Sequence, residues 1–295
     1  MLQNIKVNFE EHLKDKVCYM KYADLHIHSC YSDGVYSPEE IIEIAKGNGV
    51  KCISITDHDC IGSQYITRKQ YNDIEIIPGI ELSAEYKDIE LHILGYFIDV
   101  NNNMLKESVE LLNEQRIKRV EKIIYNLKKY DIILNADKII EKNKSTIGRS
   151  HIAYAMVEEG YFTNYKQAFQ SFLVKGKPGF EKGFKLNYKE AIDIINTAGG
   201  IAVLAHPGQI YKQREVGNIL KELKCFGLKG LEVYHPSHSQ NSSNEFFNFA
   251  KKYKLCVTGG SDFHGWQTYK ETNIGNYGIN KKMMEKIVMD KNKMR

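Results

Sequence analysis

Residues 24–58 read DLHIHSCYSDGVYSPEEIIEIAKGNGVKCISITDH, and this stretch indicates the fold class. Residues 24–28 form a short strand pattern, and residues 52–55 form a second one. Between them Ser37 and Glu40 have the spacing of a helix capping box, with Pro38 suited to the first turn. Gly47 and Gly49 are positioned to end that helix. The stretch therefore predicts a strand–helix–strand unit of an α/β protein.

Strand patterns continue outward from this unit, but one long segment lacks them. From residue 104 to about residue 175 the pattern is helical, with apolar residues such as Val109, Leu112 and Val120 on one helix face. Asn187 is placed to cap the next helix, after which strands alternate with helices again. The further strand patterns are residues 74–77, 80–83, 91–96, 201–205, 230–233 and 255–258.

We therefore expect one parallel α/β barrel interrupted by helices. The expected organisation is an N-terminal extension (1–19), a first barrel part (20–103), a helical insertion (104–186) and a second barrel part (187–295). Within the insertion, a run of basic residues is predicted to be the solvated face of a helix rather than a basic patch. That run contains Arg116, Lys118, Arg119, Lys122, Lys128 and Lys129.

The composition is that of an ordinary globular protein, with 42% hydrophobic and 26% charged residues among 295 and a net charge of +4. No apolar run approaches the ~20 residues that span a bilayer, and the N-terminus lacks the features of a secretory signal. We expect a cytoplasmic protein without a membrane partner. The six cysteines show no CxxC spacing, so a zinc ribbon is excluded.

Histidines and carboxylates gather in compact motifs near the ends of the predicted strands. Because side chains alternate across a strand, His26 and His28 point to the same side and can bind one ion together. Each histidine alone is more simply a structural residue, but six beside acids favour a metal centre. The other histidines are His58, His92, His206 and His264, and the acids are Asp24, Asp33, Asp57, Asp59, Glu81 and Asp262. Imidazole with carboxylate suits zinc, manganese or iron, and the number of acids suggests more than one ion.

The motifs DLHIHSCYSDG, SITDHD, PGIELS, LHILGY, VLAHP and GGSDFHG, in this order, resemble those of the PHP (polymerase and histidinol phosphatase) family of phosphoesterases. The resemblance runs from about residue 21 to residue 265. It is closest to the branch with nucleoside 3',5'-bisphosphate phosphatases and 5'-to-3' exoribonucleases, which carries a helical insertion at the same place. It implies a distorted (β/α)7 TIM-like barrel with a trinuclear centre.

The resemblance also implies which residues bind the ions. The first ion would be held by His26, His28, Glu81 and Asp262, and the second by Asp33, His58 and His264. Glu81 would bridge to a third ion held by His92 and His206. Two or three divalent ions (Mn, Fe or Zn) are thus expected, with a metal-bound hydroxide attacking phosphorus. Asp33, His58, Glu81 and His264 are the expected catalytic residues.

Substrate contacts are expected outside the ligand set. Arg149 is the best candidate for a phosphate clamp, because a planar guanidinium suits bidentate phosphate binding. Lys177 would add positive charge, and His238 matches a family histidine that could reach the substrate phosphate. His235 is expected to be an incidental surface or packing residue. Asp57 and Asp59 have two open interpretations, namely orienting histidines or moving protons, and capping a turn.

These residues predict hydrolysis of a phosphomonoester on a small nucleotide, such as a nucleoside 3',5'-bisphosphate. Short oligonucleotides with a 5' end to attack are a further expected substrate. The alternatives are a histidinol-phosphate phosphatase, a metal-dependent amidohydrolase and a non-enzymatic metal-binding module. The sequence shows no obligatory protein partner.

Overall fold

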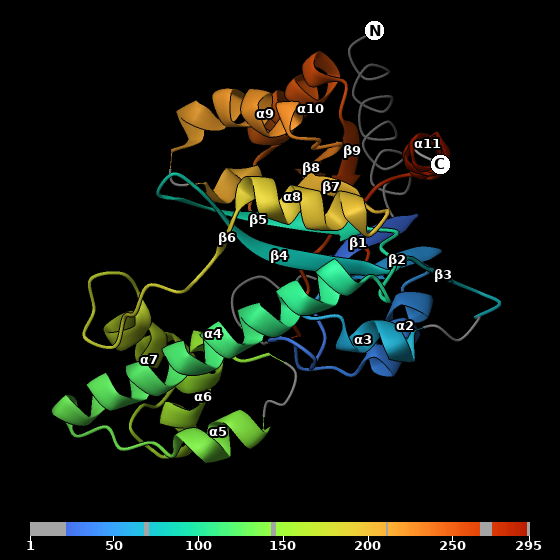
Figure 1. Cartoon of the computed structure of the whole chain (residues 1–295). Helices are drawn as coiled ribbons and strands as arrows, with labels where there is room; N and C mark the ends of the chain where they lie inside the picture. The colour runs from blue at the N-terminus through green and yellow to red at the C-terminus, as the bar shows by residue number, and fades with distance from the viewer. Residues whose placement is uncertain (1–21, 68–70, 143–145, 211, 266–272, 294–295) are drawn as a thin grey trace, which may run out of the picture.

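The computed structural model describes residues 22–67, 71–142, 146–210, 212–265 and 273–293 (Figure 1). The expected N-terminal extension, residues 1–19, lies outside these residues. The strands are β1 (Ala23–Ile27), β2 (Cys52–Ile55), β3 (Glu75–Ile76), β4 (Gly79–Tyr86), β5 (Ile89–Tyr96), β6 (Leu186–Asn187), β7 (Ile201–Leu204), β8 (Gly230–Tyr234) and β9 (Cys256–Gly259). The chain is a mixed α/β protein, as the sequence predicts.

Helices separate most of these strands, and several begin with the caps expected from the sequence. Ser37 and Glu40 form a capping box on the first described helix, and Asn187 and Glu190 form another on α8. The α-helices are α2 (Pro38–Gly47), α3 (Gly62–Ile66), α4 (Asn103–Leu127), α5 (Ala136–Lys142), α6 (Arg149–Glu158), α7 (Tyr165–Ala168), α8 (Tyr188–Thr197), α9 (Val216–Cys225), α10 (Gln240–Tyr253) and α11 (Lys281–Asn292). None of those in the described part of the chain has the length and apolar character needed to cross a membrane.

The described strands form two hydrogen-bonded sheets. The smaller sheet has the order β1-β2-β3 with all strands parallel, and the larger has the order β6-β4-β5-β7-β8-β9. Single bridges lie between them: Ile27 pairs with Phe263, just beyond β9, and His58, just beyond β2, pairs with Glu81 on β4. One bridge thus joins the end of β1 to the residues after β9, and the other joins the residues after β2 to β4.

One strand runs against the expected parallel arrangement. β5 is antiparallel to both of its neighbours, β4 and β7, and forms a hairpin with β4 through Lys87, whose φ is +54°. The expectation of an all-parallel sheet is therefore wrong at β5. The reversal explains why His92 stands near the start of its strand, whereas other candidate ligands follow the ends of theirs. Ile93 pairs with Leu204, so His92 lies beside the C-terminal end of β7.

Helices are the regular elements of the described residues between β5 and β6, and this segment has its own apolar core. In Figure 1 these helices lie apart from the sheets, with α4 running from the sheets across the whole segment. Ile123, Ile152, Met156 and Leu173 are fully buried in this core. A second core packs α8 and α9 against the larger sheet through residues such as Ile195. The helical segment thus has its own core and stands beside the sheet edge that carries the histidines.

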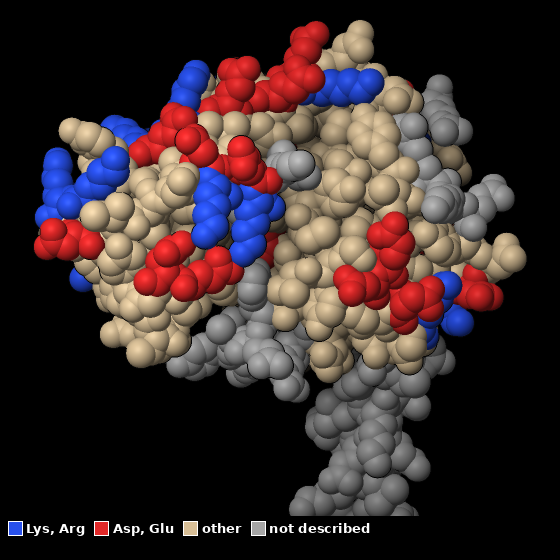
Figure 2. Space-filling view, turned by 90° about the horizontal axis from the view of Figure 1, so that it is seen from below, with Lys and Arg blue, Asp and Glu red and all other residues tan. Residues whose placement is uncertain are grey.

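Acidic and basic side chains are interspersed over much of the face seen from below (Figure 2). Two ion pairs between α5 and α6 are of this kind, Lys138 with Glu159 and Lys142 with Glu158. Exposed pairs of this type each contribute less than about 1 kcal/mol to stability. The charges seen on this face therefore fit a solvated surface.

Candidate metal centre

The strand arrangement brings nine residues together that the sequence predicts as metal ligands. Some of them lie within β1, β4 and β5, and the others follow β1, β2, β7 and β9. Their donor atoms form overlapping groups, and within each group the atoms lie within 4.8 Å of one another. The residues are His26, His28, Asp33, His58, Glu81, His92, His206, Asp262 and His264.

The first group lies at the end of β1. The two histidines from this strand place their Nε2 atoms 3.1 Å apart. Asp262 Oδ1 lies 3.4 Å from His26 Nε2 and 3.2 Å from His28 Nε2. Glu81 Oε2 lies 3.3 Å from each of the same two nitrogens. Two imidazoles and two carboxylates therefore converge on one small volume, which is the set that the sequence predicts for the first ion.

The second group surrounds Asp33, in the loop after β1. His264 Nε2 lies 3.1 Å from Asp33 Oδ1, and His58 Nε2 lies 4.0 Å from it. His28 also faces this carboxylate, with its Nδ1 4.0 Å from Oδ1. The geometry matches the set predicted for the second ion and adds His28 to its surroundings.

The third group is centred on Glu81, whose side chain is fully buried. Its Oε1 lies 2.9 Å from His92 Nδ1 and 3.0 Å from His206 Nε2. Its Oε2 lies 2.9 Å from His58 Nδ1. One carboxylate thus touches all three groups, which is the arrangement expected of a bridging ligand.

Binding of divalent ions explains the arrangement of the donor atoms better than hydrogen bonds among the side chains do. Glu81 Oε2 and His58 Nδ1 are both buried and 2.9 Å apart, yet neither makes a hydrogen bond among the described residues. Buried polar atoms in folded proteins are nearly always hydrogen-bonded, so such a pair needs another partner. Imidazole nitrogens and carboxylate oxygens that face a shared space are the ligands that zinc, manganese and iron take.

The charge state of the site also suits cations. Burial alone would raise the pKa of Glu81, but the charges of His58 and His26 hold it well below its usual range. Burial likewise favours a raised pKa at Asp33, and the charge of His264 outweighs it, so this pKa is also low. Both carboxylates are therefore ionised at neutral pH, as metal ligands must be.

Two glycines allow close packing of the backbone at the site. A Cβ atom on Gly260 would lie 2.3 Å from the Cβ of His26 and 2.4 Å from its backbone nitrogen. A Cβ on Gly79 would lie 2.2 Å from Ser54 Oγ. Three site residues also adopt left-handed backbone conformations, with φ of +48° at Asp59, +23° at His206 and +50° at Asp262. Such conformations are strained for residues other than glycine and are common at functional sites.

Asp57 and Asp59 accept hydrogen bonds from groups other than histidine rings. Asp57 accepts from the backbone and hydroxyl of Ser29 and from the hydroxyl of Ser32, so it caps the loop that carries Asp33. Asp59 accepts from the backbone and hydroxyl of Ser83 and from the Arg116 guanidinium. Of the two interpretations left open by the sequence, the loop-capping one describes the contacts of Asp57.

Arg116 corrects one expectation from the sequence. The basic run on α4 is not wholly a solvated face, because Arg116 pairs with the fully buried Asp59 and keeps only 20% of its side chain exposed. Arg119 is also partly buried and donates to the backbone oxygen of Glu181. Lys118, between them, is exposed. Residues 116 and 119 are three positions apart and therefore lie on the same face of the helix, toward the site. The number of basic residues in the run does not show which of them face the site.

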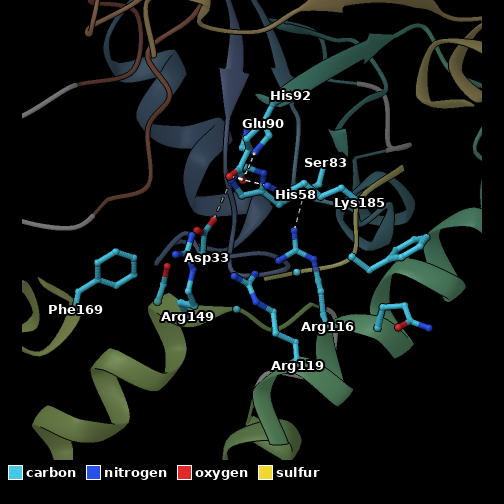
Figure 3. Close-up of a pocket in the computed structure, with 15 residues that line it drawn as sticks. Asp33, His58, Ser83, Glu90, His92, Arg116, Arg119, Arg149, Phe169 and Lys185 are labelled. Atoms are coloured by element: carbon cyan, nitrogen blue, oxygen red, sulfur yellow. Dashed lines mark hydrogen bonds and ion pairs between the residues drawn. The ribbon is translucent and has the colours of Figure 1, made fainter. Parts of the chain in front are cut away.

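A pocket leads from the ligand groups to the helical segment. Asp33, His58 and His92 line one side of it, and three arginines reach toward them from α4 and α6 (Figure 3). The cationic side chains of its wall are Arg116, Arg119, Arg149 and Lys185. Phe169 and Phe184 also line the pocket.

The cations of this pocket lie close enough to affect one another. Burial, together with the charges of Arg149 and Arg116, lowers the pKa of Arg119 to about 10. Burial also lowers the pKa of Arg149, whose guanidinium lies 5.5 Å from the Phe169 ring centroid and 5.6 Å from that of Phe180. Lys185 pairs with Glu90 at 2.6 Å. Glu90 and Asp59 each pair with one of these cations, and the crowded cations that remain, Arg119 and Arg149, suit an anionic ligand.

Two predicted substrate residues lie elsewhere. Lys177 is exposed in the turn after η2 (Phe169–Leu173) and does not line this pocket. Both ring nitrogens of His238 bond to backbone atoms: Nδ1 donates to the Val233 oxygen at 2.9 Å, and Nε2 accepts from Gly208 at 3.1 Å. Their substrate-binding roles stay predictions without support from this geometry. Lys185, which sequence reasoning missed, takes the position in the pocket that Lys177 was expected to have.

Sequence reasoning also missed two residues behind the ligands. Glu232 on β8 is fully buried and contacts both His26 and His206. His235, expected to be a packing residue, lies 3.2 Å from Asp262 Oδ2 through its Nε2 and 2.8 Å from Ser237 Oγ through its Nδ1. A clue was available for Glu232, because an acid within the apolar run of a central strand needs a buried partner.

Comparison with known proteins agrees with this geometry. A sequence model of the PHP domain matches residues 24–236. The chain is 30% identical over 250 residues to a 3',5'-nucleoside bisphosphate phosphatase of Chromobacterium violaceum, covering 83% of this chain and 88% of that protein. It is 32% identical over 253 residues to a 5'-3' exoribonuclease of Haemophilus influenzae, covering 83% and 92%.

A solved structure from Bifidobacterium adolescentis, assigned to the metal-dependent phosphoesterases, has the same fold. It superposes with a TM-score of 0.81 at 25% identity, covering 90% of this chain and 95% of that one. The resemblance stated from the motifs is therefore confirmed. The matched domain spans most of the chain and contains most of the clustered ligands, so the chain belongs to the PHP-domain family and is a metal-dependent phosphoester hydrolase.

Proposed function

We propose that this protein hydrolyses a phosphomonoester of a small nucleotide that carries a second phosphate, such as a nucleoside 3',5'-bisphosphate. The observation that carries the proposal is the pocket that joins Asp33, His58 and His92 to the cationic wall of the helical segment. One phosphate would lie at the ligand groups and the other against the arginines. The bisphosphate phosphatase of Chromobacterium violaceum supports the choice of substrate class.

The ligand groups would hold two or three divalent ions (Mn, Fe or Zn). His26, His28, Glu81 and Asp262 would hold the first, and Asp33, His58 and His264 the second. His92 and His206 would hold the third with Glu81, which contacts members of every group. When bound, the ions supply an activated water molecule and neutralise the phosphoryl oxygens. Asp33, His58, Glu81 and His264 are the proposed catalytic residues.

Arg149 and Arg119 would bind the second phosphate. Each guanidinium carries five N–H donors, more than its contacts with backbone oxygens use. The Arg149 guanidinium lies 5.5 and 5.6 Å from the centroids of two phenyl rings, and its Nη1 donates to the Leu173 oxygen at 3.0 Å, so these contacts position the side chain before a substrate arrives. Preorganised donors lose less entropy on binding, which favours recognition of phosphate at this position.

The same wall disfavours histidinol phosphate, because that substrate carries a cationic amine in place of a second phosphate. Like charges across a binding site cost several kcal/mol, by an order-of-magnitude estimate. A short oligonucleotide with a 5' phosphate offers a second anion as the bisphosphate does, and the exoribonuclease of Haemophilus influenzae supports testing it. The expected cytoplasmic location remains a prediction.

A distorted (β/α)7 barrel is also part of the proposal. The two bridges support it, because they would join β1, β2, β4, β5, β7, β8 and β9 into one ring. The helical segment with its own core supports an insertion over residues 104–186 between two barrel parts, 20–103 and 187–295.

Steady-state kinetics on adenosine 3',5'-bisphosphate and on the two adenosine monophosphates test the proposal. A charge-assisted hydrogen bond contributes about 1.5–3 kcal/mol. We therefore expect Arg149→Ala to raise KM for the bisphosphate by about tenfold or more while kcat changes little. Lys118→Ala, at an exposed lysine that does not line the pocket, is the control and should leave KM unchanged. An Arg149→Ala variant that weakens all three substrates equally would rule out a second-phosphate site.

A further inference from the structure

Glu232 contacts two parts of the metal centre with its two carboxylate oxygens. Its side chain is fully buried on β8, behind the ligand groups. Oε1 lies 3.0 Å from His26 Nδ1, and Oε2 accepts from the backbone nitrogen of His206 at 2.7 Å. The first partner is on β1 and the second follows β7, so one carboxylate joins two strands that are not neighbours.

The contact with His26 selects one form of the imidazole. A neutral imidazole carries its proton on one nitrogen only, and the hydrogen bond of one nitrogen decides which. A carboxylate accepts and does not donate, so Nδ1 must carry the proton. The lone pair is then on Nε2, which faces His28, Glu81 and Asp262. Only this tautomer allows His26 to bind an ion in the first group.

The contact with His206 holds a strained piece of backbone. This residue has φ of +23° and ψ of 61°, which is unusual for a non-glycine residue. Its amide donates to Glu232, and Gly208, two residues later, donates to His238 Nε2 at 3.1 Å. These two anchors fix the turn from which the His206 ring reaches Glu81 Oε1, at 3.0 Å.

We propose that Glu232 is a positioning residue that sets the His26 tautomer and the His206 backbone together, and so couples the first and third ion sites. The proposal rests on the metal-dependent function proposed above. His26 belongs to the first group and His206 to the third, and the Glu232 side chain hydrogen-bonds to both of them. Glu81 also lies close to both residues, but it is itself a ligand. Loss of the carboxylate should therefore weaken both sites at once.

Glu232→Gln is the sharpest variant, because it keeps the size of the side chain. Glutamine has one carbonyl oxygen for two donors, and its amide group must face either His26 Nδ1 or the His206 amide. Loss of such an orienting partner typically costs 10–100-fold in metal affinity, by an order-of-magnitude estimate. One of the two contacts is lost, and because the carboxylate couples the sites we expect weaker binding at both ion sites, read as metal bound per chain after equilibration with Zn²⁺ or Mn²⁺.

Nitrogen-15 NMR of histidine-labelled protein gives a readout that does not depend on activity. In the wild type we expect a protected Nδ1–H resonance for His26 and a protected amide for His206, in the zinc-loaded and in the chelated protein alike. Glu232→Gln should lose protection at one of the two. Asp57 is also a fully buried carboxylate and bonds to Ser29 and Ser32, and Asp57→Asn should keep both the His26 and the His206 proton protected. The exposed Glu245→Gln should bind metal like the wild type.

The outcomes separate this proposal from the function on which it rests. If the wild type lacks both protected protons, Glu232 does not orient His26 or His206. This outcome is measured on the wild type alone and does not depend on whether a variant folds. If Glu232→Gln keeps both protons and binds each ion within about threefold of the wild type, the coupling is wrong. If the wild type shows both protons but binds no ion, the orienting contacts stand and the metal-dependent function fails.

Discussion

Replacement of Arg116 by methionine tests how the helical segment is fixed to the site. Asp59 is fully buried and accepts from Arg116 Nε at 2.9 Å and from its Nη2. Removing one partner of a buried ion pair costs about 3–5 kcal/mol, because the other charge stays buried and uncompensated. One fifth of the Arg116 side chain is exposed, so we expect the lower end, about 3 kcal/mol.

Thermal unfolding of the zinc-loaded protein measures this loss. A loss of about 3 kcal/mol corresponds to a fall in Tm of about 6–12 °C, at about 2–4 °C per kcal/mol for a large domain. Lys118→Met is the matched control, because this exposed lysine lies on the same helix, and it should leave Tm within about 1 °C. Asp59→Asn combined with Arg116→Met should recover part of the loss, since the unpaired charge is gone.

The same variant has a predictable pH dependence. Burial would raise the pKa of Asp59, but the Arg116 charge outweighs burial and lowers it below the usual value. Stability from a lowered carboxylate pKa is present above the unfolded pKa, about 3.9, and is lost as pH falls through the folded value. The difference between wild type and variant should be full at neutral pH. It should shrink as pH falls through the Asp59 pKa of the variant, which burial raises, and shrink further below about pH 4 as the wild type loses the ion pair. A difference under about 1 kcal/mol at neutral pH would refute a buried, structural ion pair.

Three further predictions concern other parts of the site. Gly260→Ala should abolish metal binding at the first group, because the new Cβ would lie 2.3 Å from that of His26, and metal analysis after gel filtration checks this. Burial lowers the pKa of His238 to about 4, so stability should fall as pH drops from about 6.5 toward 4, and His238→Gln should flatten that part of a urea-unfolding profile. Chelation should lower Tm, since an ion at a hundred times its Kd stabilises a protein by about 2.7 kcal/mol; an unchanged Tm would mean that the ligand groups hold no ion.

Periodicity and capping signals predicted the secondary structure of this chain well, because they are local. β2 has the predicted bounds, and the capping box of Ser37 and Glu40 is present. The orientation of β5 could not be read in this way. A hairpin turn through Lys87 and a crossover to a parallel strand differ in their long-range pairing, which the alternation of apolar residues does not specify.

The ligand cluster was predictable for a different reason. Histidines and acids at strand ends have few structural uses in such number, and their motifs match a known family in order. The residues that support the ligands were not predictable, because their role depends on partners distant in sequence. Glu232 contacts His26 across 206 positions, and Arg116 contacts Asp59 across 57. The apolar run around Glu232 indicates a buried partner but not which residue it is, and the pairing of Arg116 leaves no signal in a single sequence.

Phosphate release from adenosine 3',5'-bisphosphate by the Mn²⁺-loaded protein tests the central claim most directly. Wild type, Glu81→Gln and the surface control Glu245→Gln are measured at equal metal concentration. We predict release by the wild type and the control, and a loss of at least about a hundredfold in Glu81→Gln, since stabilisation of several kcal/mol depends on this carboxylate. Fully metallated wild type that releases no phosphate above the metal-only blank, or a Glu81→Gln variant as fast as the wild type, would contradict it.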